Sequence, residues 1–277
     1  MLLRIFVILI ILALLGCNQL SKTTHSAPTD SSNVNNSKEL KPMPTETCIS
    51  DLKERLLLLF NGGGIDDNNY KPEEDKDLMF IKEIRSCPRD EAIASLLDLQ
   101  IKNKDSIELT AKSAYLLVKI GSEKERAGEA LISTFSAKHK EILDRYRDKD
   151  YGDKVKNNKY DDKFGELEIL DLISDVIEND YKDLLPKTFE IAPETDGVSS
   201  EQLSFIYSRA FRSDPEGFLR MLKVKSVRVK GSVYQLLIPG LTKDQLKKCL
   251  SQIPKNSDVS SMAEDMRRIS AKSNVDF

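Results

Sequence analysis

Apolar residues recur at three- and four-residue spacings along most of the chain after residue 47, which is the period of an amphipathic α-helix. Polar turns, glycine or proline separate these segments. The pattern predicts helices over residues 48–60, 72–86, 89–101, 105–120, 122–147, 164–179, 199–212, 215–222, 226–238, 242–253 and 257–272. In residues 224–230 valines alternate with basic residues, so a short strand is the alternative there.

The predicted helices are short to medium in length and are joined by short polar turns, which indicates an all-α fold. We expect an irregular α-solenoid or a stack of antiparallel helical hairpins. Residues 72–142 loosely resemble HEAT-like repeats, in which two helices pack in each unit. The resemblance depends on helix length and on small residues such as Ala111, Ala114 and Ala130. An irregular globular helical domain is the alternative.

A polar segment of mixed charge, residues 149–163, has no apolar period and is predicted to be an exposed loop. It separates an N-terminal helical, HEAT-like part at 46–148 from a C-terminal helical part at 164–277. Helix ends are marked by side chains that cap helices, such as Thr242, and by a candidate capping box that begins at Ser122. Gly121 is expected to end the helix over 105–120.

The first 17 residues carry a different signal. Arg4 precedes an apolar run over 5–15, which is shorter than the roughly 20 residues that cross a bilayer. The run ends in Leu14-Leu15-Gly16-Cys17, which resembles the lipobox of bacterial lipoproteins. The resemblance implies that residues 1–16 are removed as a signal peptide and that Cys17 is acylated. An ordinary signal peptide or an N-terminal membrane helix is the alternative.

Residues 17–45 follow as a lipidated cysteine and a flexible tether, because this stretch is polar and contains almost no large apolar residue. Asn18, rather than aspartate, follows the lipobox cysteine. Among lipoproteins this favours the outer membrane, so we expect a lipid-anchored protein of the cell envelope that faces the periplasm. In a host with one membrane, the protein would instead face the cell surface.

Three cysteines remain after Cys17 is assigned to lipid: Cys48, Cys87 and Cys249. Cys48 starts the first predicted helix and Cys87 follows the second. An antiparallel hairpin would bring them together, and an exported protein meets an oxidising compartment. We predict a Cys48–Cys87 disulfide, which non-reducing peptide mapping would detect, and a buried thiol at Cys249.

Charge is unevenly distributed. The whole chain has a net charge of −3, whereas residues 201–255 contain eleven basic and four acidic residues, a net charge of +7. This asymmetry favours an acidic partner or anionic headgroups. The basic residues predicted to contact a partner are Arg220, Lys223, Lys225, Arg228 and Lys230.

Four carboxylates share one face of the helix over 164–179: Glu168, Asp171, Asp175 and Glu178. They form either a solvated face or a second contact with a partner. No feature of the sequence separates their pKa values as an acid–base pair requires.

Familiar catalytic motifs are absent from the sequence: it contains no HExxH, CxxC or GxSxG. His25 lies in the tether, and His139 falls on an apolar helix stripe, where a packed role is expected. The segment 61–69 lacks the ligand spacing of a calcium loop and is predicted to link two helices. We therefore expect no enzyme, metal site, cofactor, small-molecule substrate or nucleic-acid partner.

The sequence favours a membrane-anchored periplasmic lipoprotein that acts as a non-enzymatic protein-binding or scaffold module. One alternative is an immunity lipoprotein that neutralises a toxin acting in the periplasm, for which a neighbouring toxin gene would be evidence. Another is a cell-envelope hydrolase that uses paired carboxylates, which predicts activity on peptidoglycan or phospholipid.

Overall fold

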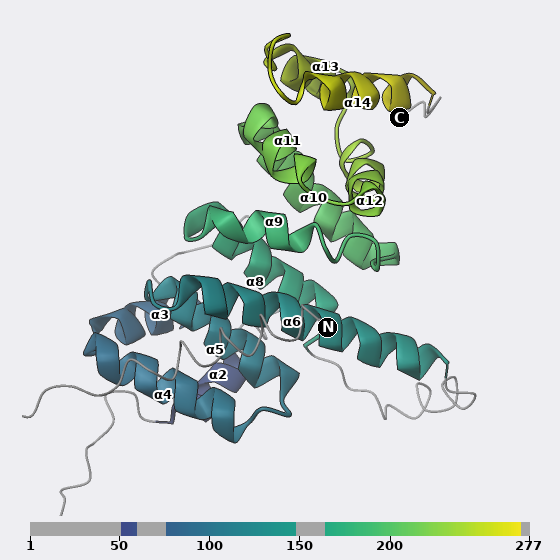
Figure 1. The fold of residues 1–277 in the computed structure, drawn as a ribbon. Coiled ribbons are helices and arrows are strands. Elements are labelled where there is room, and N and C mark those ends of the chain that lie inside the picture. Colours follow the sequence, from purple (N-terminus) through teal and green to yellow (C-terminus); the bar gives the residue numbers. More distant parts are fainter. Residues whose placement is uncertain (1–50, 60–75, 148–163, 273–277) are drawn as a thin grey trace, which may run out of the picture. The chain divides into compact units, whose positions relative to one another are not determined.

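The computed structural model describes residues 51–59, 76–147 and 164–272 (Figure 1). The chain divides into two units, 1–45 and 46–277, and every described residue belongs to the second. The predicted signal peptide, the lipobox with Cys17, the tether, Cys48 and the predicted loop at 149–163 lie outside the described residues. Within the described ranges, no helix has both the length and the apolar character needed to cross a membrane.

The described part of the chain is all-helical, as the sequence predicts, with twelve α-helices, one 3-10 helix (η1) and no strand. The N-terminal helices are α2 (Leu52–Leu58), α3 (Lys76–Ser86), α4 (Arg89–Lys102), α5 (Ile107–Lys119) and α6 (Lys124–Tyr146). The others are α8 (Glu166–Asn179), η1 (Lys182–Leu184), α9 (Leu185–Thr188), α10 (Gly197–Ser213), α11 (Pro215–Lys223), α12 (Val227–Leu237), α13 (Lys243–Ser251) and α14 (Ser260–Lys272).

Several helix ends follow directly from local chemistry. The Ser106 and Thr242 side chains accept hydrogen bonds from backbone N–H groups in the first turns of α5 and α13. After α5, Gly121 has φ of 74°, and the N–H groups of Gly121 and Ser122 donate to the carbonyls of Val118 and Leu117. This is a Schellman ending, in which glycine adopts the left-handed conformation.

Two local predictions are wrong. The candidate capping box at Ser122 does not form, because α6 is preceded by Glu123 with φ of 49° and no side-chain cap. The strand alternative at 224–230 is wrong because Ser226 caps α12 and accepts from the Val229 N–H. The short elements η1 and α9 were not predicted.

The helix α5 lies at the centre of the N-terminal part, where it packs against α2, α4, α6 and α8. Its buried residues lie on more than one face, as is typical of a helix that sits between other helices. One of them is Lys112, which is fully buried. Its Nζ donates to Glu108 Oε1 at 2.5 Å and to the Leu57 carbonyl at 3.4 Å, and it lies 5.1 Å from the Phe164 ring centroid. Lys112 thus connects α2 to α5.

An aromatic cluster organises the C-terminal part. Phe218 lies 5.1–6.2 Å from the ring centroids of Phe189, Tyr207 and Phe211, in edge-to-face arrangements. The Tyr207 hydroxyl donates to the Thr188 carbonyl at 2.8 Å. Around this cluster, α10 packs against α8, α11, α12 and α13, and α11 packs against α14. Because α8 also contacts α5 and α6, the two helical parts share one continuous core.

Candidate functional site

A groove of about 740 Å³ is lined mainly by α12 and α14. Lys223 at the end of α11 and Asp258 just before α14 also line it. This volume falls in the range of ligand-binding pockets, roughly 300–1,000 Å³. We call it the α12–α14 groove.

The α12–α14 groove has an apolar interior. Tyr234 and Met262 are buried in its lining, whereas Val227 and Ile269 are 85% and 41% exposed. Burial, together with the nearby charge of Asp265, raises the pKa of Tyr234 to about 12. The Tyr234 side chain therefore stays neutral at physiological pH and offers apolar surface with a hydroxyl tip.

Gly231 lines the same groove at the middle of α12. A Cβ added at this position would meet no atom within 4 Å. Packing inside the protein therefore does not require glycine here. The missing side chain leaves open space in the groove.

The predicted basic residues divide into two groups. Arg220 pairs with Glu216 and Asp258, Lys223 pairs with Asp258 at 3.0 Å, and Lys225 pairs with Glu190 at 2.7 Å. The hydrogen bond from Lys223 is the main cause that lowers the pKa of the Asp258 carboxyl. Glu190 and Asp258 were not foreseen as partners, because they lie outside the segment 201–255, whereas Glu216 lies inside it.

Arg228 and Lys230 form the second group. Arg228 is exposed, Lys230 is half-buried, and neither makes an ion pair with any carboxylate in the described ranges. Lys230 lines the α12–α14 groove together with the other predicted contact Lys223. The groove therefore collects two of the five predicted basic residues, and one of them has its charge uncompensated there.

The predicted acidic row on α8 is largely occupied by contacts inside the protein. Lys119 Nζ lies 2.6 Å from Asp175 Oδ2 and 2.7 Å from Asp180 Oδ2, and the Tyr115 hydroxyl donates to Asp175 Oδ2 at 2.8 Å. Burial alone would raise the pKa of Asp175, but these hydrogen bonds and the Lys119 charge outweigh it and lower the pKa below its usual value. Asp175 therefore fastens α8 to α5.

The other members of the row also have partners. Glu168 accepts the Gly165 N–H at the start of α8, and Asp171 accepts from Gln202 Nε2 on α10. Glu178 pairs with Arg209 on α10 at 2.7 Å. The shared face is confirmed, and each carboxylate on it holds a neighbouring group of the same chain.

The cysteines agree with the sequence as far as they are described. Cys87 is disulfide-bonded, and Cys249 is a free thiol buried beside Leu246 and Leu250 on α13. Burial raises the pKa of the Cys249 thiol, which keeps it protonated and unreactive. The pairing of Cys87 with Cys48 stays a prediction.

His139 is packed, as expected, but its polar partners were missed. Its ring stacks on Phe135, and Nδ1 lies 2.6 Å from Glu166 Oε1, while Ser199 donates to the other Glu166 oxygen. His139 Nε2 is buried without a hydrogen bond to any described group. These residues come from α6, α8 and α10, so no local sequence pattern connects them.

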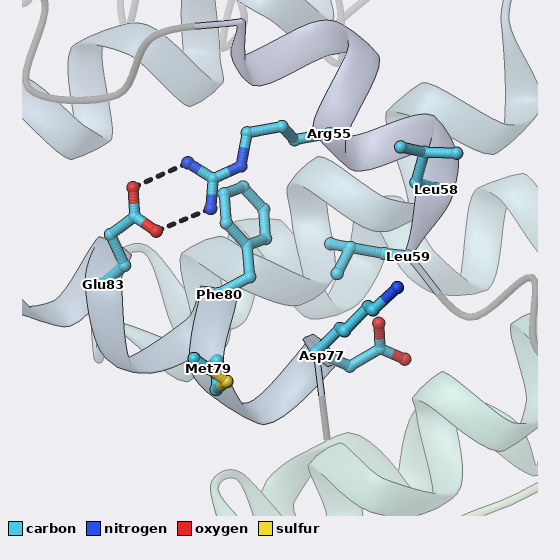
Figure 2. A pocket seen from close by; sticks show the side chains of 8 residues that line it. Arg55, Leu58, Leu59, Asp77, Met79, Phe80 and Glu83 are labelled. Carbon is cyan, nitrogen blue, oxygen red and sulfur yellow. Dashed lines mark hydrogen bonds and ion pairs between the residues drawn. The ribbon is translucent and has the colours of Figure 1, made fainter. Parts of the chain in front are cut away.

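A second pocket, of about 500 Å³, is formed by α2 and α3 (Figure 2). Both guanidinium NH2 groups of Arg55 donate to the two Glu83 oxygens, at 2.6 and 2.5 Å, and the guanidinium lies 4.3 Å from the Phe80 ring centroid. The hydrogen bond from Arg55 lowers the pKa of Glu83. Because these charges satisfy each other, the pocket offers no open charge from this pair to a ligand.

In the described ranges, no group of three or more histidine, cysteine or acidic side chains is arranged to hold a metal ion. No family model, curated protein or solved structure matches the chain. The case for function therefore depends on the chain's own residues.

Proposed function

We propose that this protein is a lipid-anchored, non-enzymatic protein-binding module of the cell envelope. The observation that carries the proposal is the α12–α14 groove, which combines a buried apolar interior, exposed apolar residues at its edge and an uncompensated lysine. Helix-binding proteins use apolar grooves of this kind, and charged groups at the edge of an interface set the choice of partner.

The proposed anchor is the acylated Cys17, and the proposed location is the periplasmic face of the outer membrane. Support comes from the lipobox-like Leu14-Leu15-Gly16-Cys17 and from Asn18. We also propose that consecutive helices stack as antiparallel hairpins in an irregular solenoid. Packing of α4 on α3, of α5 on α4 and of α6 on α5 supports that arrangement.

Anchoring is tested first. Intact-mass spectrometry of the native protein should show loss of residues 1–16 and fatty acyl chains on the new N-terminal cysteine. A Cys17→Ala variant should leave the membrane fraction, whereas a Cys249→Ala control should stay with it. An unmodified N-terminus, or membrane sedimentation of Cys17→Ala, would remove the anchor from the proposal.

Protein binding is tested by photocrosslinking in the native host. A photoreactive amino acid at Val227 should give a discrete crosslinked protein band. The same amino acid at Ile101, an exposed apolar residue on α4, is the matched control. The proposal requires that the band depends on position 227 and is lost when Gly231→Leu fills the groove. Equal bands from both positions, or none from either, would contradict it.

A further inference from the structure

We propose that the α12–α14 groove binds an amphipathic α-helix of its partner, one that carries acidic residues beside its apolar stripe. This inference rests on the proposed protein-binding function and names the chemistry of the partner. It follows from the space in the groove, from its apolar residues and from the distribution of charge around it.

The space at Gly231 is the first argument. A glycine in the interior of a helix costs about 1 kcal/mol relative to alanine. No atom lies within 4 Å of the position that a Cβ would take, so the fold gains no close packing from this glycine. What the glycine provides is room on the groove side of α12, where a side chain of a docked helix can lie.

The apolar residues are the second argument. Val227, Gly231 and Tyr234 succeed one another at four- and three-residue spacings along α12, and Met262 and Ile269 lie seven residues apart on α14. Each helix therefore presents to the groove two apolar residues that lie two turns apart, with Gly231 between them on α12 and Asp265 between them on α14. A docked helix with apolar residues at positions i, i+3 or i+4 and i+7 matches rows of this spacing.

The charge around the groove is the third argument, and it predicts which residues flank the apolar stripe of the docked helix. In the groove lining, Asp258 is paired with Lys223, and Asp265 is paired with Arg268 at 2.7 Å. Lys230 in the lining and Arg228 beside it have no carboxylate partner in the part of the chain that the structure describes. The charges left to be matched are positive, and a carboxylate on the partner would match them.

An anionic membrane surface is the competing occupant, because it also suits exposed valines and basic residues. The lining of the groove argues against it. A flat bilayer would not fill the space at Gly231, which lies in the lining. The side chain of a docked helix can enter that space, and acidic residues on its flanks can lie beside Lys230 and Arg228.

The test is a selection from a displayed library of helical peptides. All members share one apolar stripe, and their flanking positions vary among acidic, neutral and basic residues. The full chain in neutral phosphatidylcholine nanodiscs is the target, and empty nanodiscs provide the background. Since the whole chain has a net charge of −3, general electrostatic attraction would favour basic peptides. Enrichment of acidic flanks would therefore report the local charge of the groove.

Three variants make the result specific. Gly231→Leu should weaken the selected peptides at least tenfold, with the helical circular dichroism unchanged. Lys230→Glu should weaken acidic peptides about fivefold, the factor for about 1 kcal/mol, and should shift the selection toward basic flanks. Lys247→Glu, at an exposed position of α13 outside the groove lining, is the matched control and should change neither.

Several results would overturn the inference: no enrichment, enrichment without acidic preference, or selected peptides that bind Gly231→Leu as tightly as the native chain. Binding to vesicles that contain phosphatidylglycerol, lost in Lys230→Glu and not competed by the peptides, would replace it with a membrane contact. If the Val227 crosslink in cells persists while the selection fails, the partner is a protein of different chemistry and the proposed function still holds. If both fail, the proposed function fails too.

Discussion

The acidic row on α8 and the basic segment that spans α11 and α12 have the same appearance in sequence, namely several like charges within a few helical turns. Their surroundings differ. Asp175 on α8 is half-buried and bonded to Lys119 and Tyr115 on α5, whereas Arg228 on α12 is exposed and has no ion pair in the described ranges. The row on α8 holds helices together. The basic segment leaves charge available to another molecule.

This difference arises from the position of each helix. The helix α8 contacts α5, α6 and α10, so its polar face meets other helices. The helix α12 packs mainly on α10, and its other side lines the groove. A run of like charges therefore indicates an interaction surface only where the helix that carries it has a side free of neighbouring helices.

The largest effect that we predict is loss of the cation between α5 and α8. Lys119→Met should lower the free energy of unfolding by about 3 kcal/mol, because Lys119 is only 10% exposed and its removal leaves Asp175 without its cation and Asp180 with only the longer ion pair to Arg85 at 3.9 Å. Lys230→Met should change it by less than about 0.5 kcal/mol. Urea denaturation of both variants measures the contrast. Similar losses would show that the two regions do not differ as described.

A smaller and pH-dependent effect is predicted at Asp175. Its pKa is lowered in the folded protein, so its ion pair stabilises the fold fully above the ordinary aspartate pKa of about 4. That contribution is lost as the pH falls through the lowered pKa. Asp175→Asn should cost about 1 kcal/mol at pH 7, a modest figure because a third of the side chain is exposed.

The measurement for Asp175 is chemical denaturation across a pH series. The difference between native protein and Asp175→Asn should shrink toward zero as the solution is acidified below pH 4. A difference that stays constant with pH would mean that the carboxylate charge has no part in the contact. The exposed Asp144→Asn is a useful comparison, because its partner Arg147, the residue directly after the end of α6, lies at 3.5 Å on the surface.

Gly231→Ala should act in the opposite direction and stabilise the protein by about 0.5–1 kcal/mol. Alanine has the higher helix propensity, and its Cβ would meet no atom within 4 Å. Gly128→Ala is the contrasting variant, because a Cβ there would lie 2.9 Å from Leu184 Cδ1. This variant should gain less stability than Gly231→Ala, or lose stability. Thermal unfolding monitored by circular dichroism compares the two. Destabilisation by Gly231→Ala would show that the space beside α12 is needed for folding.

The smallest predicted effect concerns the basic residues that form ion pairs. It tests whether such a pair stabilises the fold, as the α8 row does, or contributes little, as is expected for Arg228 and Lys230. Lys225→Ala should cost about 0.5 kcal/mol, since its partner Glu190 is largely exposed and surface pairs contribute little. A double-mutant cycle with Glu190→Ala isolates the pair. A coupling energy above about 2 kcal/mol would show that the Lys225–Glu190 pair stabilises the fold as strongly as the contacts of the α8 row do.

The sequence predicted the helices better than their polar contacts. Periodicity and a cap such as Thr242 located helix starts because both signals are local. The alternation of valines and basic residues at 224–230 also fits a strand, in which Val227 and Val229 would share one face. In α12 these two valines lie on different faces, because Val229 is buried and Val227 is exposed. The α8 row was recognised as one face, but its partners Lys119 and Tyr115 lie about 60 residues away. Only the tertiary arrangement brings them together.

The groove illustrates the same limit. Lys223 and Lys230 were singled out by charge, but no signal in the sequence marked Gly231, Met262 or Ile269 as part of a groove. A count of charges identifies a basic segment, but it does not show which of its residues form ion pairs within the protein. Which residues remain open depends on Glu190 and Asp258, which the count over 201–255 left out.

Lys112 gives the molecule a built-in chemical reporter. Amine-reactive acylating reagents modify lysines according to their access to solvent, and Lys112 has none in the native fold. Its Nζ is covered where α2 meets α5, so its acylation in a time course followed by mass spectrometry would register local opening of the fold at this contact.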